Sequence, residues 1–207
     1  MTKTHILGIA AAASLAAFSQ MTAAAGFNYT YADAGYRNVD SDDYSGDGFQ
    51  VGFSFGATDY IHVVGNYSRL WVDDIDGTSD ADVDIDEFTI GFGSHYSITD
   101  KIDLVGEVSY VDDQYTGDAV PKSLGYRTNI NRKEEGYQAT LYGRIQAMKK
   151  LEMTPHIVHR EVNGSDTGFG LGLVYDLTKK FAIRARATSF SGDNDTTNLF
   201  VGIRLNM

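Results

Sequence analysis

Hydrophobic and polar residues alternate with a period of two over most of the chain. This alternation is typical of β-strands whose two faces meet different surroundings. In residues 49–56, Phe, Val, Phe and Phe alternate with Gln, Gly, Ser and Gly, and residues 87–93 repeat the pattern. Five further segments follow it at 102–110, 137–145, 168–176, 181–188 and 198–207. The pattern therefore predicts seven regular two-faced strands.

Three further segments predict less regular strands. The segment 27–38 carries Tyr and Ala on both faces, so its phase stays open, and 60–72 places Ile61, Val63, Tyr67 and Trp71 on one face. The segment 153–162 contains Pro155, which cannot donate to a strand ladder and is expected at a strand start or a bulge. The total is ten strands, an even number that suits a closed single-chain barrel. Eight strands are the alternative, if two of these segments are loops.

The expected connections between strands alternate in length. Tight turns are predicted near residues 58–59, 99–100, 149–150 and 178–179. The other connections are predicted at 40–48, 73–84, 112–135, 163–167 and 192–196. Short periplasmic turns and longer outer loops are the usual asymmetry of outer-membrane barrels. The pattern thus favours an orientation with both chain ends and all tight turns in the periplasm.

The first residues have the features of a secretory signal peptide. Lys3 precedes an apolar stretch from Ile6 to Phe18, and small residues follow at 23–25. The stretch is shorter than the roughly 20 residues of a membrane-spanning helix. We therefore expect a signal peptide at 1–25 and a single barrel domain at 26–207. Cysteine is absent, so this exported chain would contain no disulfide, and the net charge of −11 argues against nucleic acid as a partner.

A soluble lipocalin-like barrel or a sandwich would show the same alternation, but two features favour a membrane barrel. The polar face is rich in Gly, Ser, Thr and Gln with isolated charges, which suits an enclosed interior better than a water-exposed surface. Aromatic residues stand near strand ends, as expected of interfacial girdles; they are Tyr60, Trp71, Tyr96, Tyr110, Tyr137 and Tyr175. We interpret the chain as an all-β, transmembrane antiparallel up-and-down β-barrel.

Several segments resemble those of a known group of proteins. The segments "GFQVGFSFGATDYIHVVGNYSRLW", "GLGLVYDLT" and "LFVGIRLNM" are similar to small bacterial outer-membrane β-barrels of the OmpA-like and porin-like superfamily. The resemblance extends over nearly all of 26–207. It implies insertion by the barrel-assembly machinery and residence in the outer membrane. It carries no catalytic signature.

Strand parity assigns a set of charged side chains to the barrel interior. They are Glu87, Asp103, Glu107, Arg144, Arg160, Arg184, Arg186 and Arg204. In sequence order the acids come first and the arginines later. One interpretation is a transverse field across a narrow lumen, and the other is a plug of salt bridges, for which the planar guanidinium of arginine is well suited. Because ten strands enclose more space than side chains need to fill, we favour a narrow water-filled path.

The sequence gives little support for catalysis or for a bound cofactor. His95-Tyr96-Ser97 is similar to the His-x-Ser of a lipid A deacylase barrel, but its predicted place is inward-facing beside a periplasmic turn, with no matching Glu. His62, His156 and His159 are scattered over two strands without the spacing of a metal site. We therefore expect no enzyme activity, no metal and no cofactor, with a lipid A-modifying hydrolase as the remote alternative.

Charged residues crowd the predicted outer loops. The acidic groups are Asp40, Asp42 and Asp43 in the first loop and Asp73, Asp74 and Asp76 in the second. They do not follow EF-hand spacing. They fit either weak divalent cation sites that bridge to lipopolysaccharide or solvated loops, and we favour the latter. The third loop carries Lys122, Arg127, Arg132 and Lys133, which could contact lipopolysaccharide phosphates or the acidic loops.

Two classes of function remain open on this evidence. The first is a monomeric barrel that is structural or forms a narrow porin-like channel for small polar solutes. The second is a surface binding or adhesion barrel that acts through its outer loops. In both, the expected partners are outer-membrane lipid and lipopolysaccharide, together with the assembly machinery during insertion.

Overall fold

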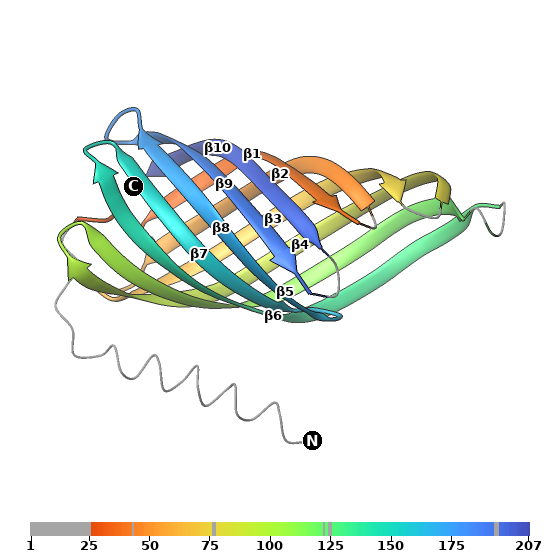
Figure 1. Cartoon of the computed structure of the whole chain (residues 1–207), viewed down its shortest axis with the longest axis horizontal. Coiled ribbons are helices and arrows are strands. Elements are labelled where there is room, and N and C mark those ends of the chain that lie inside the picture. The colour runs from red at the N-terminus through yellow and green to blue at the C-terminus, as the bar shows by residue number, and fades with distance from the viewer. Residues whose placement is uncertain (1–25, 43, 76–77, 122, 124–125, 193–194) are drawn as a thin grey trace, which may run out of the picture.

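The computed structural model describes residues 26–42, 44–75, 78–121, 123, 126–192 and 195–207. These residues form a closed antiparallel barrel in which each strand pairs with its neighbours in the sequence and β1 pairs with β10 (Figure 1). The strands are β1 (Tyr31–Ser41), β2 (Tyr44–Gly56), β3 (Ile61–Ile75), β4 (Thr78–Thr99), β5 (Ile102–Pro121), β6 (Thr128–Met148), β7 (Leu151–Glu161), β8 (Ser165–Asp176), β9 (Phe181–Ser191) and β10 (Thr196–Asn206). The prediction of ten strands is confirmed, and the eight-stranded alternative is wrong. The described residues include no helix that is long and apolar enough to cross a membrane.

The pairing register places most of the large apolar side chains of the barrel wall on the outer face, whereas a few, such as Val105, Val174 and Phe200, are buried. Phe53 of β2 stands opposite Ala32 of β1 and Gly65 of β3, and its side chain is exposed on the outside. A shift of one residue would turn the whole strand over, so the alternating pattern fixes the register. The same pairing settles the open phase of β1, because it directs Asp33 and Arg37 into the barrel, where both are buried.

The four tight turns lie where the sequence predicts them, and two are built by the same device. In the β2–β3 turn, the Thr58 hydroxyl accepts hydrogen bonds from the backbone N–H groups of Tyr60 and Ile61. In the β8–β9 turn, Thr178 accepts the corresponding bonds from Lys180 and Phe181. A threonine hydroxyl that captures nearby backbone donors stabilises a tight reversal of the chain.

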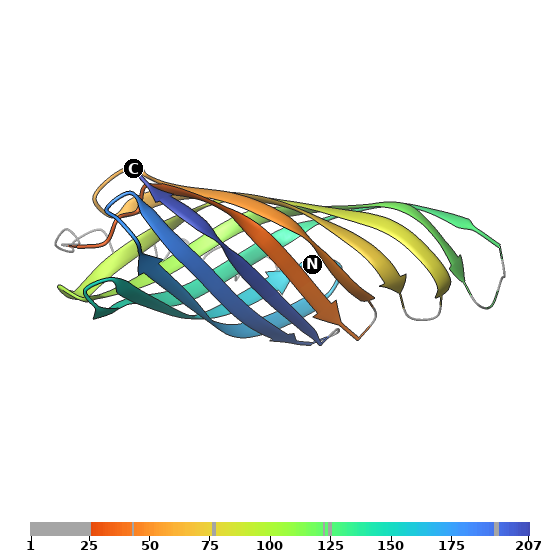
Figure 2. The ribbon, with the colours of Figure 1, turned by 90° about the horizontal axis from the view of Figure 1, so that it is seen from above.

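The connections at the opposite end differ from the prediction of long loops. Strands β3 to β6 are 15, 22, 20 and 21 residues long, whereas the other strands have 11 to 13 residues. Most of the predicted loops 40–48, 73–84 and 112–135 are therefore strand. Strands β3 to β6 extend well past the rest of the barrel on one side (Figure 2). We call this extension the outer crest.

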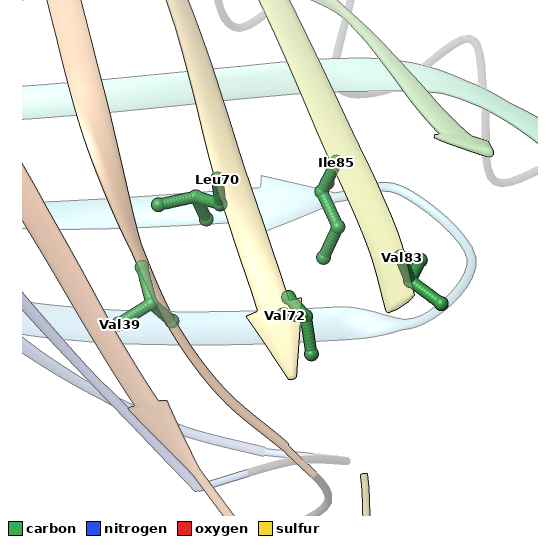
Figure 3. Close-up of a cluster of buried hydrophobic side chains, with 5 residues drawn as sticks. All are labelled: Val39, Leu70, Val72, Val83 and Ile85. Carbon is green, nitrogen blue, oxygen red and sulfur yellow. The ribbon is translucent and has the colours of Figure 1, made fainter. Parts of the chain in front are cut away.

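In the outer crest, the two faces of the sheet exchange their polarity. Within the barrel, β4 turns Phe88 and Phe92 outward, and both side chains are exposed. Toward the outer end of the same strand, Val83 and Ile85 point inward and are buried, while the aspartates that alternate with them face outward. The inward side chains form a small apolar core of Val39, Leu70, Val72, Val83 and Ile85 (Figure 3). An apolar inside and a polar outside are typical of a sheet in water, and the band of outward apolar side chains on β4 ends between Asp86 and Phe88.

Aromatic side chains mark this boundary on the outer surface. Trp71 and Tyr110 are exposed there, as expected of a girdle. The Tyr110 hydroxyl donates to Asp112 at 3.4 Å, and Tyr67 and Tyr137 donate in the same way to Asp86 and Glu161. Each ring thus lies against the apolar band while its hydroxyl bonds to a carboxylate on the outer side.

The expected place of Pro155 is wrong in detail. It is the fifth residue of β7, faces outward, and lies neither at the strand start nor at a register shift. The β6–β7 ladder is interrupted beside it, at Gly143 and Arg144, and continues in the same register on both sides. The pairing of Pro155 with Leu171 of β8 is kept. Pairing with β8 and the pairs with β6 on both sides of the interruption therefore keep β7 in register although Pro155 has no N–H donor.

Candidate functional site: the barrel interior

The barrel encloses a cavity of about 410 Å³ that is lined by side chains from all ten strands. It extends from Ser41 and Thr196, at the outer ends of β1 and β10, to Arg144 and Arg204 near the periplasmic ends of their strands. Its charged lining residues are Asp33, Arg37, Glu87, Glu107, Asp113, Arg132, Glu134, Arg144, Glu152, Arg160, Asp166, Arg184, Arg186 and Arg204. Seven acids and seven arginines thus face one space, without a lysine.

The eight charged residues predicted for the interior all point inward. Seven of them line the cavity, whereas Asp103 is buried beneath it, at 1% exposure. Sequence reasoning missed Asp33 and Arg37 because the phase of β1 was open. It missed Asp113 and Glu152 because one fell in a predicted loop and the other before a predicted strand start. Only the register between strands reveals these four.

A chain of ion pairs crosses the cavity at mid-height. Arg37 on β1 contacts Glu87 on β4 at 3.2 Å, and Glu87 contacts Arg160 on β7 at 2.7 Å. Arg160 also contacts Asp113 on β5 at 2.5 Å. In the closed barrel, β10, β9 and β8 lie between β1 and β7. The series of ion pairs therefore reaches from one wall of the barrel to the other. At this level the acids on β4 and β5 pair across the bore with the arginines on β1 and β7.

A second cluster lies toward the periplasmic end. The Arg144 guanidinium donates to both carboxylate oxygens of Glu152, at 2.7 and 2.8 Å, and to the Asn28 carbonyl at 2.9 Å. Its plane lies over the rings of Phe27 and Tyr29, at 4.7 and 4.6 Å from their centroids. A bidentate arginine pair with stacked rings is a rigid arrangement. Arg144 therefore attaches the segment before β1 to the opposite wall.

That segment crosses the end of the barrel at which the tight turns lie. Tyr29 is only 8% exposed, donates its hydroxyl hydrogen to Asp103 at 2.8 Å, and stacks on His95 with the ring centroids 3.7 Å apart. Gly26 lies against the carbonyl of Asp100 in the β4–β5 turn, across the barrel from β1. Residues 26–30 therefore run across this end of the barrel from β1 toward β4, β5 and β6.

The histidines and Ser97 have different partners. The Ser97 hydroxyl donates to Asp103 at 2.6 Å, while the His95 ring stacks on Tyr29. His62, His156 and His159 bond separately to Glu107, Thr188 and Thr167. Among the described residues, no group of three or more potential ligands is placed to hold a metal ion.

The charged residues of the outer crest pair mainly with one another. Lys133 contacts Asp112 at 2.9 Å and Glu135 at 2.5 Å, and its hydrogen bond lowers the pKa of the Glu135 carboxyl. Arg127 contacts Asp118 at 2.8 Å, and Arg132 pairs with Glu134. The predicted basic patch is thus largely neutralised by acids of the same hairpin. Lys122 lies outside the described residues.

The acidic residues singled out from the sequence lie at the outer ends of two hairpins. Asp40 is an exposed residue of β1, and Asp42 follows that strand. Asp73 and Asp74 belong to β3. Asp43 and Asp76 lie outside the described residues. The expectation that these residues form loops is wrong for Asp40, Asp73 and Asp74, because strand pairing continues through them.

Comparisons with known proteins agree on the fold alone. No family model matches the chain, and no curated relative matches its sequence. The solved structures that resemble it include OprG from Pseudomonas aeruginosa, with 13% identity over 88% of this chain and 98% of that one and a TM-score of 0.51. The translocator domain of the autotransporter NalP from Neisseria meningitidis has 11% identity over 99% and 96%, with a TM-score of 0.53. The β domain of the Bordetella autotransporter BrkA has 11% identity over 88% and 100%, also with a TM-score of 0.53. The chain therefore has the fold of the bacterial outer-membrane β-barrels.

Proposed function

We propose that this protein is a monomeric outer-membrane barrel that forms a narrow, gated channel for small polar solutes. Residues 1–25 act as its signal peptide, the tight turns face the periplasm and the outer crest faces the cell exterior. The observation that carries the proposal is the polar cavity of about 410 Å³, lined from all ten strands and reaching the outer ends of β1 and β10.

Two features of the interior restrict passage. The ion-pair chain from Arg37 to Asp113 narrows the bore, and residues 26–30 close its periplasmic end. Opening requires the Tyr29 ring to leave its contacts with Asp103 and His95. The barrel wall keeps its backbone ladder while this happens, so the gate can move without unfolding the barrel.

Replacing Tyr29 with alanine tests the gate. We expect the wild-type protein to show a small conductance in planar bilayers and Tyr29→Ala to show a severalfold larger one, because the ring that covers the periplasmic end is gone. Tyr36→Ala is the matched control, since Tyr36 lies on β1, the strand that follows Tyr29, and faces outward at 53% exposure. Absence of any conductance in well-inserted wild-type and Tyr29→Ala protein would reject the channel and leave a structural barrel.

The outer crest supports surface binding as the second candidate function. Strands β5 and β6 are among the longest and extend beyond the rest of the barrel, where lipopolysaccharide or another surface partner could reach them. Deleting residues 112–135 should then abolish binding to such a partner, and intact binding would count against this function. Lipid A hydrolysis is the remote third candidate, and an assay of purified barrel beside His95→Ala tests it.

A further inference from the structure

Two of the seven arginines that line the cavity have no partner. Arg37, Arg132, Arg144, Arg160 and Arg184 each pair with a carboxylate of the lining. Arg186 and Arg204 make no hydrogen bond or ion pair with any residue that the structure describes. Arg204 is only 4% exposed, and its Nε is buried without an acceptor. Buried guanidinium groups without acceptors are costly, so they point to a missing ligand.

Each carboxylate of the lining has at least one partner, while Asp33 Oδ1 and Asp113 Oδ1 are buried without a hydrogen bond to any residue that the structure describes. Glu87, Asp113, Glu134 and Glu152 are held by arginines of other clusters, and Glu107 bonds to His62 and Tyr142. Asp166, at the outer end of β8, also has an interaction of its own. Asp33 pairs with Arg184 and stands opposite Arg204 in the strand register. Of the three arginines on this part of the wall, only Arg184 forms an ion pair with Asp33 among the described residues.

The three arginines lie side by side on β9 and β10, and we call them the arginine wall. Arg184 and Arg186 are two residues apart on one face of β9, a separation of about 7 Å along a strand. Arg204 is two residues from Gly202, the partner of Arg184 on β10. The charges that act on Arg186 come from Arg184, Arg37, Asp33 and Glu87. Of the two acids, Glu87 is already held by Arg37 and Arg160.

We propose that the arginine wall binds a small oxyanion that carries carboxylate or phosphate groups. The planar fork of a guanidinium matches two oxygens of either group and forms charge-assisted hydrogen bonds. Arg204 is held in place because its guanidinium lies 3.8 Å from the centroid of the Tyr31 ring. The ligand must be small, since the whole cavity measures about 410 Å³. This inference deepens the proposed channel by naming an anionic solute class, although binding itself does not require conduction.

Calorimetric titration of the folded full-length barrel in detergent micelles, in low-chloride buffer, tests the site. Inorganic phosphate and succinate serve as separate probes. We expect saturable binding of at least one of them, weakened about tenfold or more in Arg186→Gln by the loss of charge-assisted hydrogen bonds. Binding of phosphate alone would identify a phosphoryl solute, and binding of both a general oxyanion site. Arg69→Gln is the matched control, because Arg69 lies on the outer surface and pairs with Asp86.

Several outcomes decide the proposal. If the wild type binds neither probe, or if Arg186→Gln binds as tightly as the wild type, the site is rejected. A gel comparing boiled and unboiled samples verifies that each variant is folded, and Arg186→Lys, which keeps the charge without the fork, should bind with intermediate strength. Binding without conductance would reject the channel and keep the site. Conductance without binding would keep the channel and reject the site.

Discussion

Replacing Phe92 with arginine is expected to destabilise the folded barrel by about 4 kcal/mol or more. An arginine on the lipid face costs about 2–4 kcal/mol at the bilayer midplane, and loss of the buried phenyl ring adds about 1.5–3 kcal/mol. Phe92 lies in the apolar part of β4 and is 47% exposed on the outer face, so its surroundings in a membrane are acyl chains. The prediction therefore tests directly which face of the sheet meets lipid.

The measurement is denaturant unfolding in phospholipid vesicles, followed by the fluorescence of the single tryptophan. Thr116→Arg is the control, because Thr116 is exposed on the outward face of β5 within the outer crest. It should change the unfolding free energy by no more than about 0.5 kcal/mol, as is usual for water-exposed sites. Equal costs for the two variants would mean that the apolar band does not contact lipid.

Glu87→Ala is expected to have the second large effect, a loss of about 3 kcal/mol. The change leaves the Arg37 and Arg160 guanidiniums facing each other without the carboxylate between them, and breaking a buried pair typically costs about 3–5 kcal/mol. The lower end applies because the cavity admits water to these side chains. The same change should raise conductance, since it removes the centre of the chain that crosses the bore.

Unfolding measurements on single and double variants test this network. Combining Glu87→Ala with Arg160→Ala should reveal a coupling energy of about 1–3 kcal/mol. Asp118→Ala is the control, because its pair with Arg127 is exposed and should contribute less than about 1 kcal/mol. A Glu87→Ala barrel as stable and as poorly conducting as the wild type would show that the ion-pair chain neither stabilises nor narrows the bore.

Most of the barrel could be predicted from the sequence because its wall separates two very different media. An apolar outer face and a polar cavity impose strict alternation, so Phe53 and Phe92 reveal their orientation without knowledge of their neighbours. The tight turns were predictable for a similar reason, since a short polar break between two alternating segments leaves little choice. The ten-strand count follows from these two signals together.

The outer crest could not be predicted because its polar and apolar faces are reversed relative to those of the rest of the barrel. Residues 81–86 alternate as regularly as residues 88–92, but with the apolar side chains inward and the aspartates outward. A run of aspartates suggests a loop by composition, and only pairing with β3 and β5 shows that it is strand. Strand propensity depends on such surroundings more than helix propensity does.

The sequence predicts which charged residues face the barrel interior but not which of them contact one another. Parity alone places Arg160 and Glu87 inside the barrel, yet their contact joins residues on β7 and β4 and depends on the tilt and register of every strand between them. The closure by Tyr29 was missed for the same reason, because residues 26–30 leave the wall and no periodic pattern marks where they cross. The unpaired state of Arg186 and Arg204 emerges only from the contacts that the other charged residues of the lining make with one another.

The most direct test of the account is the depth of Trp71 in a lipid bilayer. It is the only tryptophan, is 46% exposed, and stands at the outer end of the apolar band. In vesicles made with brominated phospholipids, we predict strong quenching of its fluorescence by bromines placed near the headgroup and weaker quenching by bromines near the chain ends. Quenching by aqueous acrylamide alone, with no effect of either brominated lipid, would contradict a barrel whose outer face lies in the membrane.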